Sequence, residues 1–136
     1  MSHEDSAIQL RTLLERYVAA FIAGDMNSVK ALWDPDASDR TYIGAELERP
    51  IFGAPALDAY YDELATVFVV TEGKVGDVAV RKVGGLAYVV THIDCVFKTG
   101  TQKFAVRLRA TILSRKRDGE WRFLHAHDSI QWKLES

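Results

Sequence analysis

One carboxylate near the end of the chain, Asp128, is a candidate for acid–base chemistry. The run from Trp121 to Ile130 alternates as a β-strand does, with Leu124, Ala126, Asp128 and Ile130 on one face. If that face points inward, Asp128 enters apolar surroundings, and burial raises the pKa of a carboxyl group. Such a group can act as a general base or acid near neutral pH. A register shifted by one residue, or an Asp near a strand end that is hydrogen-bonded to backbone, is the structural alternative.

A second acid–base pair lies on the long apolar strand that we expect from Leu86 to Phe97. His92 and Asp94 are two residues apart, so a strand places them side by side, on the same face as Tyr88 and Val90. A carboxylate beside an imidazole raises its basicity and fixes its tautomer, as in many general bases. A solvated strand end with no catalytic role gives the same spacing.

A predicted hairpin must position Asp128. The turn Arg117-Asp118-Gly119-Glu120 separates a strand-like run over residues 102–113 from the run over 121–130, and Asp-Gly between alternating runs is a strong hairpin signal. The first run places Phe104, Val106, Leu108, Ala110 and Ile112 on one face, and Arg107, Arg109 and Thr111 on the other. The face of the second run that lacks Asp128 holds Trp121, Phe123, His125, His127 and Ser129. The hairpin therefore has one apolar face with a single acid and one face rich in arginine and histidine.

The rest of the chain predicts helices followed by strands. Apolar spacing predicts amphipathic helices over residues 6–23, 26–33 and 56–65, a short strand over 41–43, a loop over 48–55, and strands from residue 74 onward. Helices first and a meander of strands afterwards indicate an α+β fold with helices on one face of an antiparallel sheet. We expect a single domain over residues 1–136.

Composition excludes several classes of function. The chain has 136 residues, 26% charged side chains and a net charge of −2, so no basic surface for nucleic acid is expected. The single cysteine, Cys95, excludes an intrachain disulfide and a multi-cysteine metal site. No third ligand is spaced to complete a metal site with His125 and His127, and no phosphate-binding glycine loop is present. We expect no metal, no cofactor, no membrane association and a cytoplasmic location.

Several stretches resemble a known superfamily. They are the helix end Phe21-Ile22-Ala23-Gly24-Asp25, the helix end Leu32-Trp33, and the pattern from Arg115 to Ser129. Together they resemble the nuclear transport factor 2-like superfamily, and its SnoaL-like and ketosteroid-isomerase-like branches are the most similar. The Asp-Gly-x-Trp turn and the His-x-His-x-Ser ending also resemble the association domain of calcium/calmodulin-dependent kinase II. The resemblance implies a cone-shaped α+β fold, in which a curved antiparallel sheet wraps a long helix and leaves an apolar cavity.

The resemblance also implies site residues. Cavity positions of the association domain match Val90, Ile112 and Asp128, which turns the face with Tyr88, His92 and Asp94 inward. Several relatives carry arginines at these positions, so the apolar residues here argue against an anionic ligand. Tyr17 matches a tyrosine that faces the cavity in ketosteroid-isomerase-like relatives, where a phenol could stabilise an oxyanion. Aromatic residues that either line the cavity or pack in the core are Trp33, Tyr42, Tyr60 and Tyr61.

Two classes of function follow. The first is a small-molecule-binding domain that acts as a cofactor-independent isomerase, dehydratase or cyclase on a small apolar molecule. Asp128, or the pair His92 and Asp94, would then move a proton, and Tyr17 would polarise the substrate. The second is a non-catalytic ligand-binding or assembly domain. In both cases the resemblance implies a homodimer through the outer face of the sheet, which would carry Arg109, His127 and the other residues of that parity, with Cys95 as a buried thiol.

Overall fold

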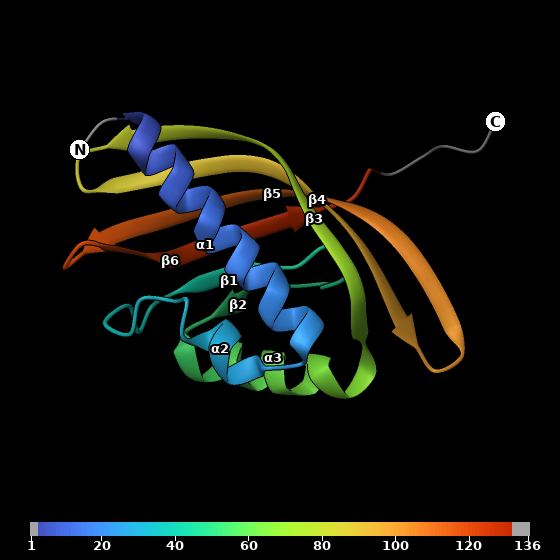
Figure 1. Cartoon of the computed structure of the whole chain (residues 1–136). Helices are drawn as coiled ribbons and strands as arrows, with labels where there is room; N and C mark the ends of the chain where they lie inside the picture. The colour runs from blue at the N-terminus through green and yellow to red at the C-terminus, as the bar shows by residue number, and fades with distance from the viewer. Residues whose placement is uncertain (1–2, 132–136) are drawn as a thin grey trace.

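Helices from the N-terminal half of the chain pack against one curved, unclosed sheet of six strands (Figure 1). The computed structural model describes residues 3–131. The elements in order are α1 (His3–Ala23), α2 (Met26–Lys30), β1 (Thr41–Ile43), β2 (Ile51–Phe52), α3 (Ala54–Val67), β3 (Val69–Val83), β4 (Leu86–Thr99), β5 (Gln102–Arg117) and β6 (Glu120–Ser129). The predicted α+β fold is confirmed. No helix within residues 3–131 has both the length and the apolar character needed to cross a bilayer.

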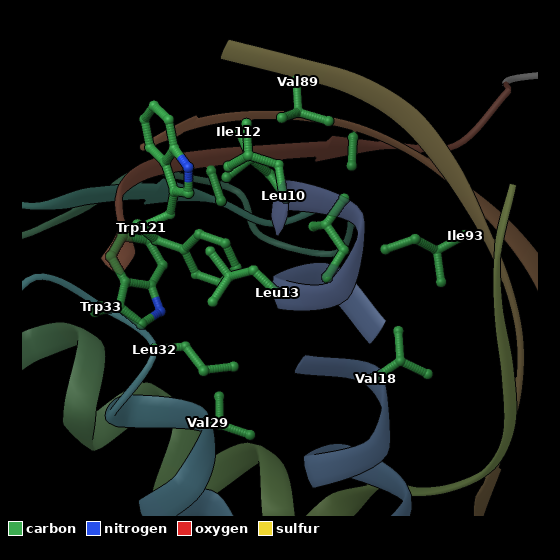
Figure 2. Packing of buried hydrophobic residues seen from close by; sticks show 14 of the residues in the cluster. Leu10, Leu13, Val18, Val29, Leu32, Trp33, Val89, Ile93, Ile112 and Trp121 are labelled. Atoms are coloured by element: carbon green, nitrogen blue, oxygen red, sulfur yellow. The ribbon is translucent and has the colours of Figure 1, made fainter. Parts of the chain in front are cut away.

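The long helix α1 lies across the concave side of the sheet (Figure 1). Its apolar stripe is buried and includes Leu10, Leu13 and Val18, which Figure 2 shows opposite side chains from the sheet. The helix ends at Ala23, and the φ of 69° at the following Gly24 is the left-handed conformation common after helices. Asp25 then accepts a hydrogen bond from the backbone N–H of Ser28 at 3.1 Å and caps α2. The sequence therefore predicted these two consecutive helices from both their apolar spacing and their capping residues.

The strands follow the order β2-β1-β6-β5-β4-β3, and the last four are joined as antiparallel hairpins. Asp118 and Gly119 both have positive φ, at 52° and 81°. That combination is typical of the two-residue hairpin turn that Asp-Gly favours. The short strand β1 instead runs parallel to β6, with Tyr42 beside Ala126. This single crossover brings a residue from the first third of the chain next to Asp128.

A β-bulge at Leu124 changes which residues of β6 face the core. Leu113 pairs with His125, whereas its neighbour Ser114 pairs with Phe123, so Leu124 has no partner. A bulge shifts the alternation by one residue. Trp121 and Phe123 are therefore 4% and 1% exposed and belong to the core. The prediction that they lie on the outer face is wrong, because strict alternation from Asp128 backwards ignores the bulge.

The core lies between the helices and the concave face of the sheet (Figure 2). Trp33 is fully buried and its ring contacts that of Phe123 at 5.7 Å between centroids. The predicted second helix ends earlier than expected, at Lys30, because residues after it form turns that hydrogen-bond to β6. The backbone N–H of Phe123 donates to the carbonyl of Leu32 at 2.9 Å. The turns after α2 are therefore tied to β6.

Candidate functional site at the inner face of the sheet

A pocket of about 380 Å³ opens between α1, α3 and the inner face of the sheet. Most of its lining is apolar or aromatic and includes Phe21, Leu64, Ile93 and Leu108. Of the residues that the structure describes around it, the charged ones are Asp128 and Glu46, and none is a lysine or an arginine. Such a lining suits a small, largely apolar ligand.

Asp128 lies on the inner face of β6, opposite Ala110 of β5, and borders the pocket. The hydroxyl of Tyr42 donates to its Oδ2 at 2.7 Å. Within residues 3–131 no group donates to Oδ1, so this oxygen is free to accept a proton. Burial raises the pKa of Asp128 to about 6, and the charge of Glu46 adds to the rise, while the Tyr42 hydrogen bond opposes it. A carboxyl group with this pKa can take or give a proton near neutral pH.

Tyr42 holds Asp128 in position. Its strand β1 runs parallel to β6, so the Tyr42 side chain points to the same inner face as Asp128. Burial, and then the neighbouring charge of Asp128, raise the pKa of Tyr42 well above its ordinary value. The phenol therefore stays protonated and remains a hydrogen-bond donor to the carboxylate.

A chain of hydrogen bonds ends at Tyr17 on the pocket wall. The indole N–H of Trp33 donates to the hydroxyl oxygen of Tyr61 at 3.1 Å, and the hydroxyls of Tyr61 and Tyr17 are 2.9 Å apart. An indole N–H can only donate, so the hydroxyl of Tyr61 accepts from Trp33 and can donate its own hydrogen bond to the hydroxyl oxygen of Tyr17. The proton of Tyr17 is then free to point toward a ligand. Burial raises the pKa of Tyr17, so this donor is also neutral.

Four of the predicted site residues therefore meet at one pocket: Tyr17, Tyr42, Tyr60 and Asp128. Trp33 and Ile112 do not line it and are instead core residues, 1% and 3% exposed. Trp33 still contributes through its hydrogen bond to Tyr61. The role of each residue in chemistry stays a prediction.

The predicted orientation of the acid–base pair on β4 is wrong. Tyr88 and Val90 are 40% and 46% exposed, whereas Val89 is 1% exposed and pairs with Ile112. His92 and Asp94 share the outer face with Tyr88 and Val90, away from the pocket. Matching Val90 to a cavity position was off by one residue, and a shift of one residue turns every side chain of a strand to the other face.

On the outer face the two residues have other partners. Asp94 binds Arg107 through two hydrogen bonds of 2.6 and 3.0 Å, and this arginine lowers the pKa of the carboxyl group. The ring of His92 covers Gly76, where an added Cβ would lie 2.1 Å from its Nε2. The pair therefore does not form the predicted general base beside the pocket.

Cys95 and Glu46 are pocket residues that the sequence did not place there. Cys95 was predicted on the outer face, which is wrong, because it has the same parity as Val89 and borders the pocket. Burial raises the pKa of its thiol, which keeps the sulfur protonated. Glu46 lies in the exposed loop after β1, where a charged residue gives no signal of a site. Tyr61 was grouped with the other aromatic residues, but spacing could not reveal its hydrogen bonds.

The histidines of β6 lie on the outer face, as alternation after the bulge requires. His127 is exposed, and His125 Nδ1 is 2.7 Å from the hydroxyl of Thr41. Burial lowers the pKa of His125. Across residues 3–131 no group of three or more histidine, cysteine, aspartate or glutamate side chains is arranged to hold a metal ion.

Comparison with known families supports the fold. Residues 10–133 match the model of the SnoaL-like domain. Among solved structures, a candidate dehydratase of the nuclear transport factor 2-like family from Streptomyces avermitilis superposes with a TM-score of 0.86 at 17% identity, over 97% of this chain and 100% of that one. A ketosteroid isomerase-like protein from Erwinia carotovora atroseptica gives a TM-score of 0.77 at 15% identity, over 98% and 100% of the two chains.

A third similar structure is a candidate calcium/calmodulin-dependent kinase II association domain from Exiguobacterium sibiricum. Its TM-score is 0.74 at 19% identity, and the match covers 98% of each chain. At these identities the likeness shows the fold alone. No curated protein matches the sequence.

Proposed function

We propose that this chain, which belongs to the SnoaL-like domain family, is a cofactor-independent acid–base enzyme that acts on a small, largely apolar molecule. One observation carries the proposal: a carboxyl group whose pKa is raised to about 6 borders an apolar pocket with one oxygen held by Tyr42 and the other free.

The proposed chemistry uses Asp128 as the base and Tyr17 as the hydrogen-bond donor. Asp128 removes a proton from a carbon next to a carbonyl group, and the electron pair of that C–H bond moves toward the carbonyl oxygen. Tyr17 donates a hydrogen bond to this oxygen as it becomes negative, which lowers the barrier. Because most of the pocket lining is apolar, both interactions are stronger there than in bulk solvent.

The fate of the intermediate sets the reaction class. Protonated Asp128 can return the proton to a different carbon, which is an isomerisation. It can instead protonate a hydroxyl leaving group, which releases water and is a dehydration. Attack of the carbanion on a second carbonyl carbon of the same molecule is a cyclisation. The likeness to a candidate dehydratase and to a ketosteroid isomerase-like protein supports chemistry of this kind without choosing among the three.

The test is solvent deuterium exchange in a panel of hydrophobic ketones, followed by proton NMR. We expect the wild-type protein to catalyse exchange at carbons next to the carbonyl group, with a rate that rises as the pH increases through about 6. Asp128→Asn should lose at least about 100-fold in rate, the usual contribution of a general base. Tyr17→Phe should lose about 10-fold or more.

The matched control is Asp94→Asn, an aspartate on the outer face of the same sheet. It should retain the wild-type rate within about twofold. If Asp128→Asn exchanges as fast as Asp94→Asn, or if no ketone exchanges with the wild-type protein, the proposed reaction is wrong.

A second proposal concerns assembly: we propose that the outer face of the sheet forms a homodimer. The exposed apolar side chains of Tyr88 and Val90 lie there, two residues apart on β4, and Val90 is opposite Thr111 of β5. Light scattering should give the mass of two chains for the wild-type protein, and Val90→Arg should give that of one. A monomeric wild-type protein excludes the dimer.

A further inference from the structure

The pocket combines two negative charges with several aromatic rings. Asp128 and Glu46 are its carboxylates, and no positively charged side chain among residues 3–131 lines it. Glu46 is exposed at the rim, where its Oε1 accepts a hydrogen bond from the hydroxyl of Tyr60. Neither carboxylate is paired with a cation in the part of the chain that the structure describes. The pocket therefore has a net negative charge above the pKa of Asp128.

Two touching rings connect the two carboxylates. Tyr60, bound to Glu46, lies 5.4 Å from the ring of Tyr42 between centroids, and Tyr42 is bound to Asp128. The charge of Glu46 also contributes to the raised pKa of Asp128, so the two groups act on each other. Both acids line the same pocket, so a small molecule that fills it can contact the rim acid and the inner acid at once.

This arrangement favours one sign of ligand charge. A carboxylate or phosphate on the ligand would lie near two negative groups in surroundings of low polarity, without a cation to offset them. An ammonium group would instead donate a charge-assisted hydrogen bond to the carboxylate of Glu46 and make cation–π contact with the rings of Tyr60 and Tyr42. Aromatic rings beside a carboxylate are a common way to bind alkylated ammonium groups.

We propose that the pocket selects a small apolar molecule that carries an ammonium group, and that Glu46 is the residue that binds this group at the rim. The proposal rests on the proposed function in placing the substrate in this pocket, with its reacting carbon at Asp128 and its ammonium group toward Glu46. Anionic molecules of the same size are excluded. Glu46 thus determines specificity and takes no part in the proton transfer.

The experiment compares three probes with one skeleton: 2-(2-naphthyl)ethylamine, 2-(2-naphthyl)ethanol and 2-naphthylacetate. Calorimetry at pH 7.5 gives the dissociation constant of each. We expect the amine to bind at least about 10-fold tighter than the alcohol, and the carboxylate at least about 10-fold weaker than the alcohol. The difference between amine and alcohol should shrink in 0.5 M NaCl, because salt screens charges near the surface.

Two variants test whether Glu46 causes the preference for the amine. Glu46→Gln keeps the size of the side chain and should bring the amine to within about twofold of the alcohol, while the affinity for the alcohol stays unchanged. Glu48→Gln is the matched control, because Glu48 is an exposed acid in the same loop that does not line the pocket, and it should behave as the wild-type protein.

Three outcomes overturn the proposal: the carboxylate binds as tightly as the amine, Glu46→Gln retains the preference for the amine, or none of the three probes binds. The proposed reaction fails separately, in the deuterium exchange of Asp128→Asn. A protein that prefers the amine but catalyses no exchange would keep the charge selection and lose the proposed function.

Discussion

Two aspartates on the same sheet have opposite properties because they lie on opposite faces. Asp128 on the inner face is opposite Ala110, whereas Asp94 on the outer face is opposite Arg107. Burial raises the pKa of Asp128 to about 6, and the arginine lowers the pKa of Asp94. Both residues were predicted as catalytic on the grounds of residue type and spacing. The comparison shows that the face of the sheet, more than the residue type, decides which carboxylate can move a proton near neutral pH.

The two faces also differ in how tightly they are packed. On the inner side Gly73 of β3 touches α1, and an added Cβ would lie 2.4 Å from Cγ1 of Val18. On the outer side the three atoms nearest to a Cβ added at Gly76 all belong to the ring of His92. The valine is buried in a helix, where a β-branched side chain has one favoured rotamer, while the half-buried histidine ring can turn aside.

The largest effect on stability is therefore expected from Gly73→Ala. The added methyl group must push α1 away from the sheet, and overpacking of this kind typically costs about 2–3 kcal/mol of unfolding free energy. Gly76→Ala should cost about 1 kcal/mol, because only a rotatable ring must move. Urea denaturation measures both, with Gly85→Ala as the control, since Gly85 has open space around it. Equal losses at Gly73 and Gly76 would show that the two faces do not differ in packing.

Asp128→Asn should stabilise the protein by about 2 kcal/mol at pH 7.5, since each pH unit of difference between folded and unfolded pKa corresponds to about 1.4 kcal/mol. The folded pKa of Asp128 is about 6, above that of an unfolded aspartate. From about pH 4 to 6 the folded protein binds more protons than the unfolded chain, so stability falls as the pH rises. The gain should be nearly absent at pH 4, which thermal unfolding at both pH values can check.

Asp94→Asn should change the stability at pH 7.5 in the opposite direction to Asp128→Asn. The pKa of Asp94 is lowered in the folded protein, so its pair with Arg107 stabilises above the pKa of an unfolded aspartate and is lost as the pH falls below it. The asparagine variant should therefore be slightly less stable at pH 7.5 and equal to the wild-type protein at low pH. A stabilising effect of both asparagine variants at pH 7.5 would remove the difference between the faces.

Tyr42→Phe should raise the pKa of Asp128 further, by about one pH unit. The phenol donates its hydrogen bond to the ionised carboxylate, and a hydrogen bond to a charged group is worth about 1.5 kcal/mol. Carbon-13 NMR titration of labelled aspartate measures this directly. Tyr60→Phe, which removes a neighbouring hydroxyl bound to Glu46, is the control. An unchanged titration of Asp128 in Tyr42→Phe would mean that this hydrogen bond does not form in solution.

The smallest effect is expected on the outer face. Arg107→Ala should let the pKa of Asp94 return toward its ordinary value and leave the titration of Asp128 unchanged. Both side chains of the pair are exposed, so solvent and salt screen the interaction and little stability should be lost. The same NMR titration detects it. A shift in the pKa of Asp128 in this variant would indicate electrostatic coupling between the two faces of the sheet.

Most of the fold was predictable from local signals. Apolar spacing predicted α1, and Gly24 and Asp25 predicted its junction with α2. The Asp-Gly turn predicted the hairpin of β5 and β6, and alternation placed Asp128 on the same face as Ala126. These signals are contained within a few residues of sequence, which is why they could be read without the tertiary structure.

The site was only partly predictable. Asp128 and Tyr17 lie at the pocket. The pair on β4 does not, because its face was assigned by matching Val90 to a cavity position, and that match was off by one residue. The bulge at Leu124 has no local signal, and it moved Trp121 into the core. Features that depend on pairing between strands cannot be obtained from one strand alone.

The sequence by itself determined that this chain forms helices followed by hairpins, and that one acid on β6 shares a face with apolar residues. Only the tertiary structure decided which acid is buried. The parallel pairing of β1 with β6 brought Tyr42 to Asp128, and the exposed loop after β1 brought Glu46 to the rim. The reason is physical: periodicity is set by backbone geometry within a segment, whereas burial and charge at a carboxylate are set by residues far away in the chain.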